Sequence, residues 1–163
     1  MAARAETLTL RSLKALLEVT SVVRGERDVA NVLSTIVRTV AEALEFRTVV
    51  LNLYRPAFDD FCVKSVHGSP EAREALLGST YDWESWQQLL QERFRHDGAY
   101  LIPHGAFDWS TDLGNRYVPQ IDPSDDPGAW HPEDELFVPF EDSEGRILGI
   151  FSVGEPRSGR RPT

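Results

Sequence analysis

The chain has 163 residues, 41% of them hydrophobic and 10% aromatic, which suits one domain with a core of its own. Its formal net charge is -9, and nucleic-acid phosphates and anionic membrane surfaces bind clustered Lys and Arg, so we expect neither nucleic acid nor membrane as a partner. Cys62 is the single cysteine, so no intrachain disulfide can form. No apolar run reaches the roughly 18 residues of a membrane span or forms a signal-peptide core, which predicts a soluble, cytoplasmic protein.

Residues 7–24 are predicted to form a first helix, because leucines recur at helical spacing until Gly25, which suits a helix end. An N-terminal helix of this kind either packs on its own domain or pairs with a second copy of the chain, and both alternatives stay open. We therefore treat residues 1–25 as a segment for dimerisation or signalling, and a homodimer is an expected assembly.

A second helix is predicted from Val29 to Glu45, where Asp28 can cap the first free backbone N–H groups. Apolar side chains recur there at i, i+3, i+4, i+7, i+8 and i+11, the clearest helical pattern in the chain. These side chains are Leu33, Ile36, Val37, Val40, Ala41 and Leu44. This face should pack on the core.

A β-hairpin is predicted next, with strands Thr48–Tyr54 and Phe61–Val66 joined by turn residues 55–60. Because side chains alternate along a strand, the first strand presents two opposite faces. One face carries Val49, Leu51 and Leu53, and the other carries Val50, Asn52 and Tyr54.

Two helices should follow the hairpin. The first, residues 70–77, has Pro70 in its opening turn and Ser69 as its cap. The second is predicted as one continuous helix from Trp83 to Phe94, because its aromatic and apolar residues recur at i, i+3, i+7 and i+11 after the capping Asp82.

The stretch from Tyr100 to Phe140 begins and ends with strand-like apolar residues and is otherwise dense in Pro, Gly, Asp and aromatic residues. Loops of this length in compact domains are usually functional or disordered, and disordered segments are poor in aromatic residues. We therefore predict an ordered lid over one side of the sheet, which forms part of a ligand pocket.

A closing hairpin is predicted from strands Leu136–Phe140 and Ile147–Val153, with residues 142–145 as its tight turn. Pro139 inside the first of these strands indicates an edge, a bulge or a bend. Strands come in hairpins and helices are grouped rather than alternating, so the predicted fold class is α+β, an antiparallel sheet with helices on its faces.

These pieces, in this order, resemble a GAF domain from about Leu13 to Pro156. Residues 13–46 resemble the opening helices of that family, residues 48–69 its first hairpin, and ELFVPF the strand that carries a Val-Pro step. The closing hairpin, EDSEGRILGIFSVGEP, matches the family's pattern of glycines and apolar residues at Gly145, Ile147, Gly149, Ile150, Phe151 and Val153.

The resemblance implies a GAF-like (profilin-like) α+β fold, with an antiparallel sheet of about six strands. N-terminal helices would pack on one face, and helices with the long loop would cover the other. Residues 26–156 would form the GAF-like domain and residues 157–163 a tail, the C-terminal helix of the family being missing. The implied role is sensory or regulatory duty in a bacterial signalling protein, beside an effector module such as a kinase, a cyclase or a transcription factor.

No catalytic constellation is present in the sequence, so we expect no enzyme. Cys62 lies in a predicted strand, which argues against a covalently bound chromophore, and a lone cysteine cannot run the disulfide chemistry of methionine sulfoxide reduction. The histidines lack the spacing of metal ligands, so no metal site is predicted and any cofactor is left unknown.

The predicted pocket rests on aromatic side chains of the helix and loop that would roof the sheet. His104, bracketed by Pro and aromatic residues, is the polar group expected to point into it. The predicted ligand-binding residues are Trp83, Trp86, Tyr100, His104, Phe107, Trp109 and Trp130.

Two functional hypotheses follow. The first is a non-catalytic sensory domain that binds a small molecule or transmits a signal. The alternative is a ligand-free protein–protein interaction or dimerisation module, in which these aromatic residues are plain core. A pocket would leave an unfilled apolar volume, whereas a core would leave none.

Overall fold

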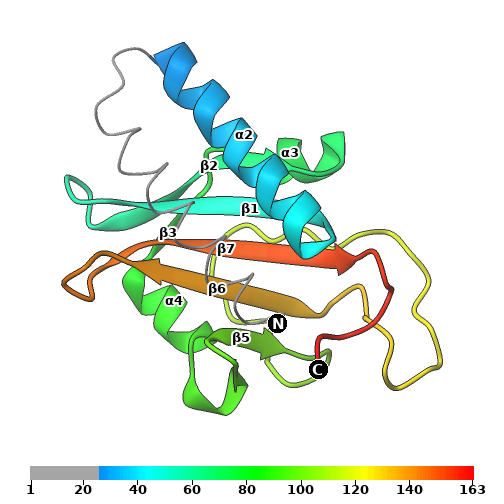
Figure 1. Cartoon of the computed structure of the whole chain (residues 1–163). Helices are drawn as coiled ribbons and strands as arrows, with labels where there is room; N and C mark the ends of the chain where they lie inside the picture. The colour runs from blue at the N-terminus through cyan, green and yellow to red at the C-terminus, as the bar shows by residue number, and fades with distance from the viewer. Residues whose placement is uncertain (1–25) are drawn as a thin grey trace.

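The computed structural model describes residues 26–163, and the predicted first helix at residues 7–24 lies outside this part of the chain. Residues 26–163 form a seven-stranded antiparallel sheet in the order β3-β2-β1-β7-β6-β5-β4 (Figure 1). The strands are β1 (Phe46–Arg55), β2 (Asp60–His67), β3 (Thr80–Asp82), β4 (Arg95–His96), β5 (Ala99–Ile102), β6 (Glu135–Glu141) and β7 (Ile147–Pro156). The helical segments are α2 (Glu26–Leu44), α3 (Pro70–Leu76), α4 (Trp83–Leu89) and the 3-10 turn η1 (Glu92–Phe94).

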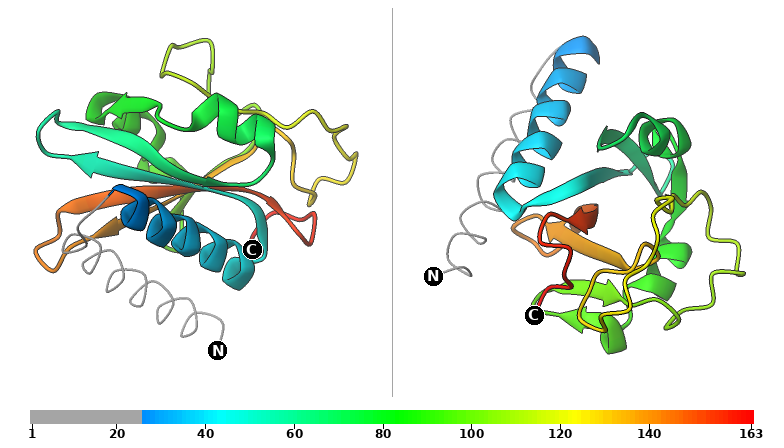
Figure 2. Two further views of the ribbon diagram at one scale, coloured as in Figure 1. Left: turned by 90° about the horizontal axis from the view of Figure 1, so that it is seen from above. Right: turned by 90° about the vertical axis from the view of Figure 1, so that its right-hand side faces the viewer.

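Helix α2 covers one face of the sheet, while α3, α4 and the long loop lie over the other, as the view from above in Figure 2 shows. The predicted α+β class is confirmed, and the short strands β3 and β4 bring the sheet to one strand more than the resemblance implied. None of the helices within residues 26–163 is long and apolar enough to cross a membrane.

The predicted apolar face of α2 packs on the sheet, against side chains of β1 and β7. Its buried residues are Leu33, Ile36, Val37, Val40 and Ala41. Burying each of the larger of these side chains favours folding by about 1.5–3 kcal/mol. The prediction of Asp28 as the cap is wrong, because the helix already includes Glu26 and Asp28 lies inside it. The chain leaves α2 at Glu45, which adopts a positive φ of 59°.

The two faces of β1 are arranged as predicted. Val49 and Leu51 are buried beneath α2, whereas Val50 packs with residues of β2 and α3 on the opposite side. Between Leu51 and Asn52 the pairing with β2 shifts in register, so the ladder is irregular at this point. The loop-side face of β1 therefore carries both an apolar cluster and a buried amide.

The predicted continuous helix from Trp83 to Phe94 is wrong in its length. Helix α4 ends at Leu89, and Phe94 belongs to the separate turn η1. Asp97 and Gly98, at positive φ of 53° and 82°, then turn the chain so that β4 pairs with β5. Phe94 is buried as its spacing suggests, but strand pairing requires the chain to leave the helix first.

Pro139 lies in a part of β6 that is paired on one side only. Strand β5 pairs with β6 only from Glu135 to Phe137, so the part of β6 that contains Pro139 is open on that side. On its other side Pro139 is paired with Ile150 of β7. Of the three predicted alternatives, an edge, a bulge or a bend, the structure thus shows a local edge at Pro139.

The C-terminal tail, residues 157–163, crosses the end of the long loop. The Arg157 N–H donates to the Glu45 carbonyl at 2.8 Å, and Arg160 forms an isolated β-bridge with Ala129. The Arg161 guanidinium binds both oxygens of Asp134, at 2.7 and 2.9 Å. This short tail thus ties the loop to the end of α2.

Candidate ligand-binding site

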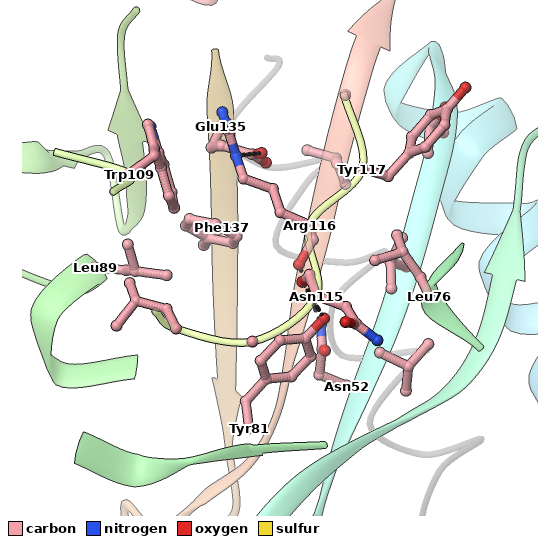
Figure 3. A pocket seen from close by; sticks show the side chains of 18 of the residues that line it. Asn52, Leu76, Tyr81, Leu89, Trp109, Asn115, Arg116, Tyr117, Glu135 and Phe137 are labelled. Atoms are coloured by element: carbon pink, nitrogen blue, oxygen red, sulfur yellow. Dashed lines mark hydrogen bonds and ion pairs between the residues drawn. The ribbon is translucent and has the colours of Figure 1, made fainter. Parts of the chain in front are cut away.

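A cavity of about 150 Å³ lies between the sheet and the long loop, on the face away from α2 (Figure 3). Strands β1, β6 and β7 form its floor, α3, β3 and α4 form its sides, and loop residues 109–119 cover it. The floor includes Thr48, Val50, Asn52, Phe137 and Ser152. The sides include Leu76, Tyr81, Trp86 and Leu89.

Asn52 is the buried polar group of this floor, with only 1% of its surface exposed. Its Nδ2 group donates to the Ile150 carbonyl at 3.0 Å and to Ser152 Oγ at 3.1 Å, both on β7. Within residues 26–163 its Oδ1 accepts no hydrogen bond, and that atom is accessible from the cavity. The site therefore holds one oriented, unused acceptor.

Loop residues 114–117 are held above the floor by hydrogen bonds with Ser69, Ser79 and Tyr81. Tyr81 Oη donates to the Asn115 carbonyl at 2.6 Å, and Asn115 Nδ2 donates to Ser79 Oγ at 2.9 Å. The Tyr117 and Ser69 hydroxyls lie 3.2 Å apart. These contacts hold the loop as a lid without regular secondary structure.

Arg116 reaches from the lid across the cavity to Glu135 at the start of β6, with Nε and Oε1 3.0 Å apart (Figure 3). Its Nη2 also donates to the Glu133 carbonyl, and its guanidinium lies 4.0 Å above the centre of the Trp109 ring. Burial raises the pKa of Glu135 to about 7, although Arg116 acts in the opposite direction. A carboxyl that titrates near neutrality therefore forms part of the wall.

The Glu135→Gln variant should change how stability depends on pH. The folded-state pKa of Glu135 exceeds its ordinary value of 4.5, so the folded protein binds this proton more tightly than the unfolded chain. The resulting stabilisation is complete below about pH 4.5 and is lost as the pH rises through about 7.

The folding equilibrium constant of the wild type should fall at least about tenfold between pH 5 and pH 8 through the loss of this proton. Glu135→Gln has no such proton and should not show this fall. Urea unfolding of both proteins across this range measures the difference. Equal slopes of stability against pH would contradict the assignment.

Three carboxylates border the cavity against the single Arg116 of its lining: Asp134, Glu135 and Glu155. Each already has a partner, since Arg161 binds Asp134, Arg116 binds Glu135 and Thr48 Oγ1 donates to Glu155 at 3.0 Å. Arg116 and Arg161 are thus both engaged, so the described lining offers an anionic ligand no free positive charge, and Glu155 is hydrogen-bonded but not ion-paired.

The structure brings three of the sequence-predicted residues to the cavity. They are Trp86, Trp109 and Trp130. Trp86 is enclosed by aromatic rings, with the Phe137 centroid 5.2 Å away and edge-on. Its indole N–H has no hydrogen-bond partner within residues 26–163. Trp130 also packs edge-on against Phe46 in the core beneath α2.

The other predicted residues lie away from the cavity lining. Trp83 is 37% exposed and packs on Phe61. Tyr100 and Phe107 pack against the core cluster that contains Ile102 and α4 residues. His104 does not line the cavity and lies beside His131.

His104, His131 and Glu133 form a cluster whose candidate ligand atoms lie within 4.8 Å of one another. The imidazole rings stack at 3.8 Å with an angle of 11°, and His104 Nδ1 lies 2.7 Å from Glu133 Oε2. Stacked rings direct their lone pairs in parallel, and His131 Nδ1 already accepts the Glu133 N–H at 3.1 Å. This arrangement suits a hydrogen-bonded cluster, and we assign no cation to it.

Sequence reasoning missed Asn52, Arg116 and Glu135. Asn52 carried a signal, because it is the one amide in the otherwise apolar strand TVVLNLY. Arg116 carried a weaker signal as a lone basic residue in an acidic loop. Their convergence on one cavity depends on the sheet order, which places β1 beside β7 and β6.

No protein-family model matches the chain, and the search of curated proteins found no match either. Solved structures do resemble it. The GAF domain of an Acinetobacter phosphoenolpyruvate-protein phosphotransferase superposes with a TM-score of 0.52 at 11% identity, over 96% of this chain and 81% of that one. The fold is that of a GAF domain.

A second GAF domain, from the phosphoenolpyruvate-protein phosphotransferase (ptsP) of Coxiella burnetii, gives a TM-score of 0.50 at 16% identity, over 94% of this chain and 81% of that one. At these identities the similarity concerns the GAF fold. The chemistry of the site must therefore come from this chain's own residues.

Proposed function

We propose that this chain is a non-catalytic sensory or regulatory GAF domain that binds a small molecule in the cavity beneath residues 109–119. The observation that carries the proposal is the unfilled space of about 150 Å³ between the sheet and its lid. Protein interiors are normally close-packed, so space of this size that opens onto a buried amide favours a binding site over plain core.

Strand β1 offers a route by which an occupied cavity could influence α2. Val50 and Asn52 face the cavity, whereas Val49 and Leu51 on the same strand pack beneath α2. A ligand with unequal affinity for two arrangements of β1 would shift the population of α2 positions. The change in α2 would then be transmitted, together with residues 1–25, to the partner in a homodimer or to an effector module. Such a module could be a kinase, a cyclase or a transcription factor.

The alternative, an interaction or dimerisation module, has one observation in its favour. A hollow of about 630 Å³ lies on the α2 side, between the end of α2, strands β5 and β6 and the tail. Size-exclusion chromatography with light scattering on the full chain tests the dimerisation form of this alternative, which requires a dimer or larger assembly irrespective of any ligand.

The first test of the proposed function is blocking the cavity. Leu76 lines it, so Leu76→Trp should fill part of the space and weaken binding of a size-matched probe such as toluene at least about tenfold. Saturation-transfer NMR with increasing toluene measures the dissociation constant. Native mass spectrometry of freshly purified protein, compared with a denatured sample, detects any ligand carried from the cell.

Leu77 supplies the matched control, because it follows Leu76 directly but is 52% exposed and does not line the cavity. Leu77→Trp should bind toluene as the wild type does. The proposal would be abandoned if toluene showed no saturable binding to the wild type, or if both variants bound it equally well.

A further inference from the structure

The size of the cavity limits what can occupy it. A closed apolar cavity of about 150 Å³ accommodates a molecule of the size of benzene. The space beneath residues 109–119 has about this volume and is partly open to solvent, so without rearrangement of the lid it encloses about one ring of a ligand.

The floor of the cavity determines which hydrogen bond a ligand can make. The Ile150 carbonyl only accepts, so the Asn52 atom that faces it must be Nδ2, and the amide orientation is thereby fixed. Both Nδ2 hydrogens are used, one by Ile150 and one by Ser152. Asn52 Oδ1 therefore presents an acceptor to the ligand.

Ser152 complements this acceptor on the neighbouring strand. Its Oγ accepts the Asn52 N–H at 3.1 Å, and its own hydroxyl proton is bonded to no residue between 26 and 163. A ligand group that donates to Asn52 Oδ1 and accepts from Ser152 Oγ would satisfy both. A hydroxyl group does this with one oxygen, and an amide does it with its N–H and carbonyl.

Charge narrows the ligand class further. Asp134 and Glu135 are already ion-paired with Arg161 and Arg116, so an anion would find no free positive charge in the described lining. Burial of an unpaired charge beside Trp86 and Phe137 would carry a large desolvation cost.

We infer that the cavity selects an uncharged, single-ring molecule whose hydroxyl or amide group donates a hydrogen bond to Asn52 Oδ1. The inference rests on the proposed function and specifies its ligand class. The phenol hydroxyl has the required donor next to an acceptor, whereas methylation to anisole removes the donor and keeps the oxygen.

The experiment compares phenol, anisole, toluene and benzoate as probes of the full chain, by saturation-transfer NMR at pH 7. Phenol should bind about three- to tenfold more tightly than anisole or toluene, the range expected for one net hydrogen bond. Benzoate should bind most weakly. The Asn52 side-chain amide signals should shift further with phenol than with toluene, because toluene acts on them through its ring current alone.

The Asn52→Leu variant, of similar size, should lose the preference for phenol and keep toluene binding. The wild-type comparison of phenol with anisole decides the matter even if this variant fails to fold. Equal binding of phenol, anisole and toluene, or strongest binding of benzoate, would overturn the ligand class and leave the proposed function standing. Binding of no probe would refute the proposed function, and the inference with it.

Discussion

Replacement of Asp134 by alanine should destabilise the protein by about 3–5 kcal/mol, because two backbone N–H groups and the partly buried Arg161 lose their acceptor. The Asp134 side chain is fully buried and accepts the backbone N–H groups of His104 and His131 at 2.7 and 2.8 Å. It also accepts two hydrogen bonds from the Arg161 guanidinium. One carboxylate therefore joins both ends of the long loop to the C-terminal tail.

The ionised form of Asp134 is the one that this arrangement favours. Burial alone would raise its pKa, but the Arg161 guanidinium and the two backbone N–H groups together hold the pKa below its ordinary value of 3.8. The stability contributed by Asp134 is therefore present above about pH 4 and is lost as the pH falls through the lowered pKa.

Urea unfolding at pH 7 measures the effect, with Asp126→Ala as the matched control. Asp126 pairs with Arg160 of the same tail at 2.9 Å, but both side chains are about half exposed, so its loss should matter far less. Asp134→Asn, which keeps one acceptor oxygen, should fall between Asp134→Ala and the wild type. An Asp134→Ala protein as stable as the Asp126→Ala control would contradict the role assigned to Asp134.

Gly149→Ala should destabilise the protein by about 3 kcal/mol, at the upper end of the range for overpacked cores. A Cβ at position 149 of β7 would lie 2.5 Å from Phe140 Cζ and 2.6 Å from the Asn52 carbonyl oxygen. A side chain could yield, but Asn52 belongs to the backbone of the central strand β1, so the sheet itself must move. We also expect weaker binding of a probe in the cavity, because the Asn52 backbone would be displaced.

Gly154→Ala on the same strand is the control. Its Cβ would meet only Trp130 Cζ2 at 3.9 Å, an ordinary contact, so its stability should equal or slightly exceed that of the wild type. Thermal unfolding of both variants by circular dichroism measures the difference. Equal melting temperatures of the two variants would show that the sheet accommodates a methyl group at position 149.

Much of the fold could be predicted from local patterns. The apolar face of α2, the alternation along β1 and the Asp-Ser-Glu-Gly turn at residues 142–145 are repeated chemical signals over short distances. The helix predicted to reach Phe94 fails because its apolar spacing persists through a break at Leu90. Phe94 could be buried in a continuous helix or in a separate turn, and the pairing of β4 with β5 requires the separate turn.

The candidate site was less predictable than the fold. Aromatic content drew attention to Trp86, Trp109 and Trp130, which do line the cavity, and equally to Trp83, Tyr100 and Phe107, which do not. A large aromatic side chain has the same sequence signature whether it fills a core or borders a cavity.

The fold class, the core-facing side of α2, the two faces of β1 and the loop as a cover could all be predicted from residue patterns along the chain. Two features became visible only in three dimensions: Asn52, Arg116 and Glu135 meet at one cavity, and Asp134 holds two histidines and Arg161 together. Most of those contacts join residues far apart in the chain: Arg116 and Glu135 are 19 positions apart, and His104 and Asp134 are 30 positions apart. Sheet order and loop path set such distances, and no local pattern records them.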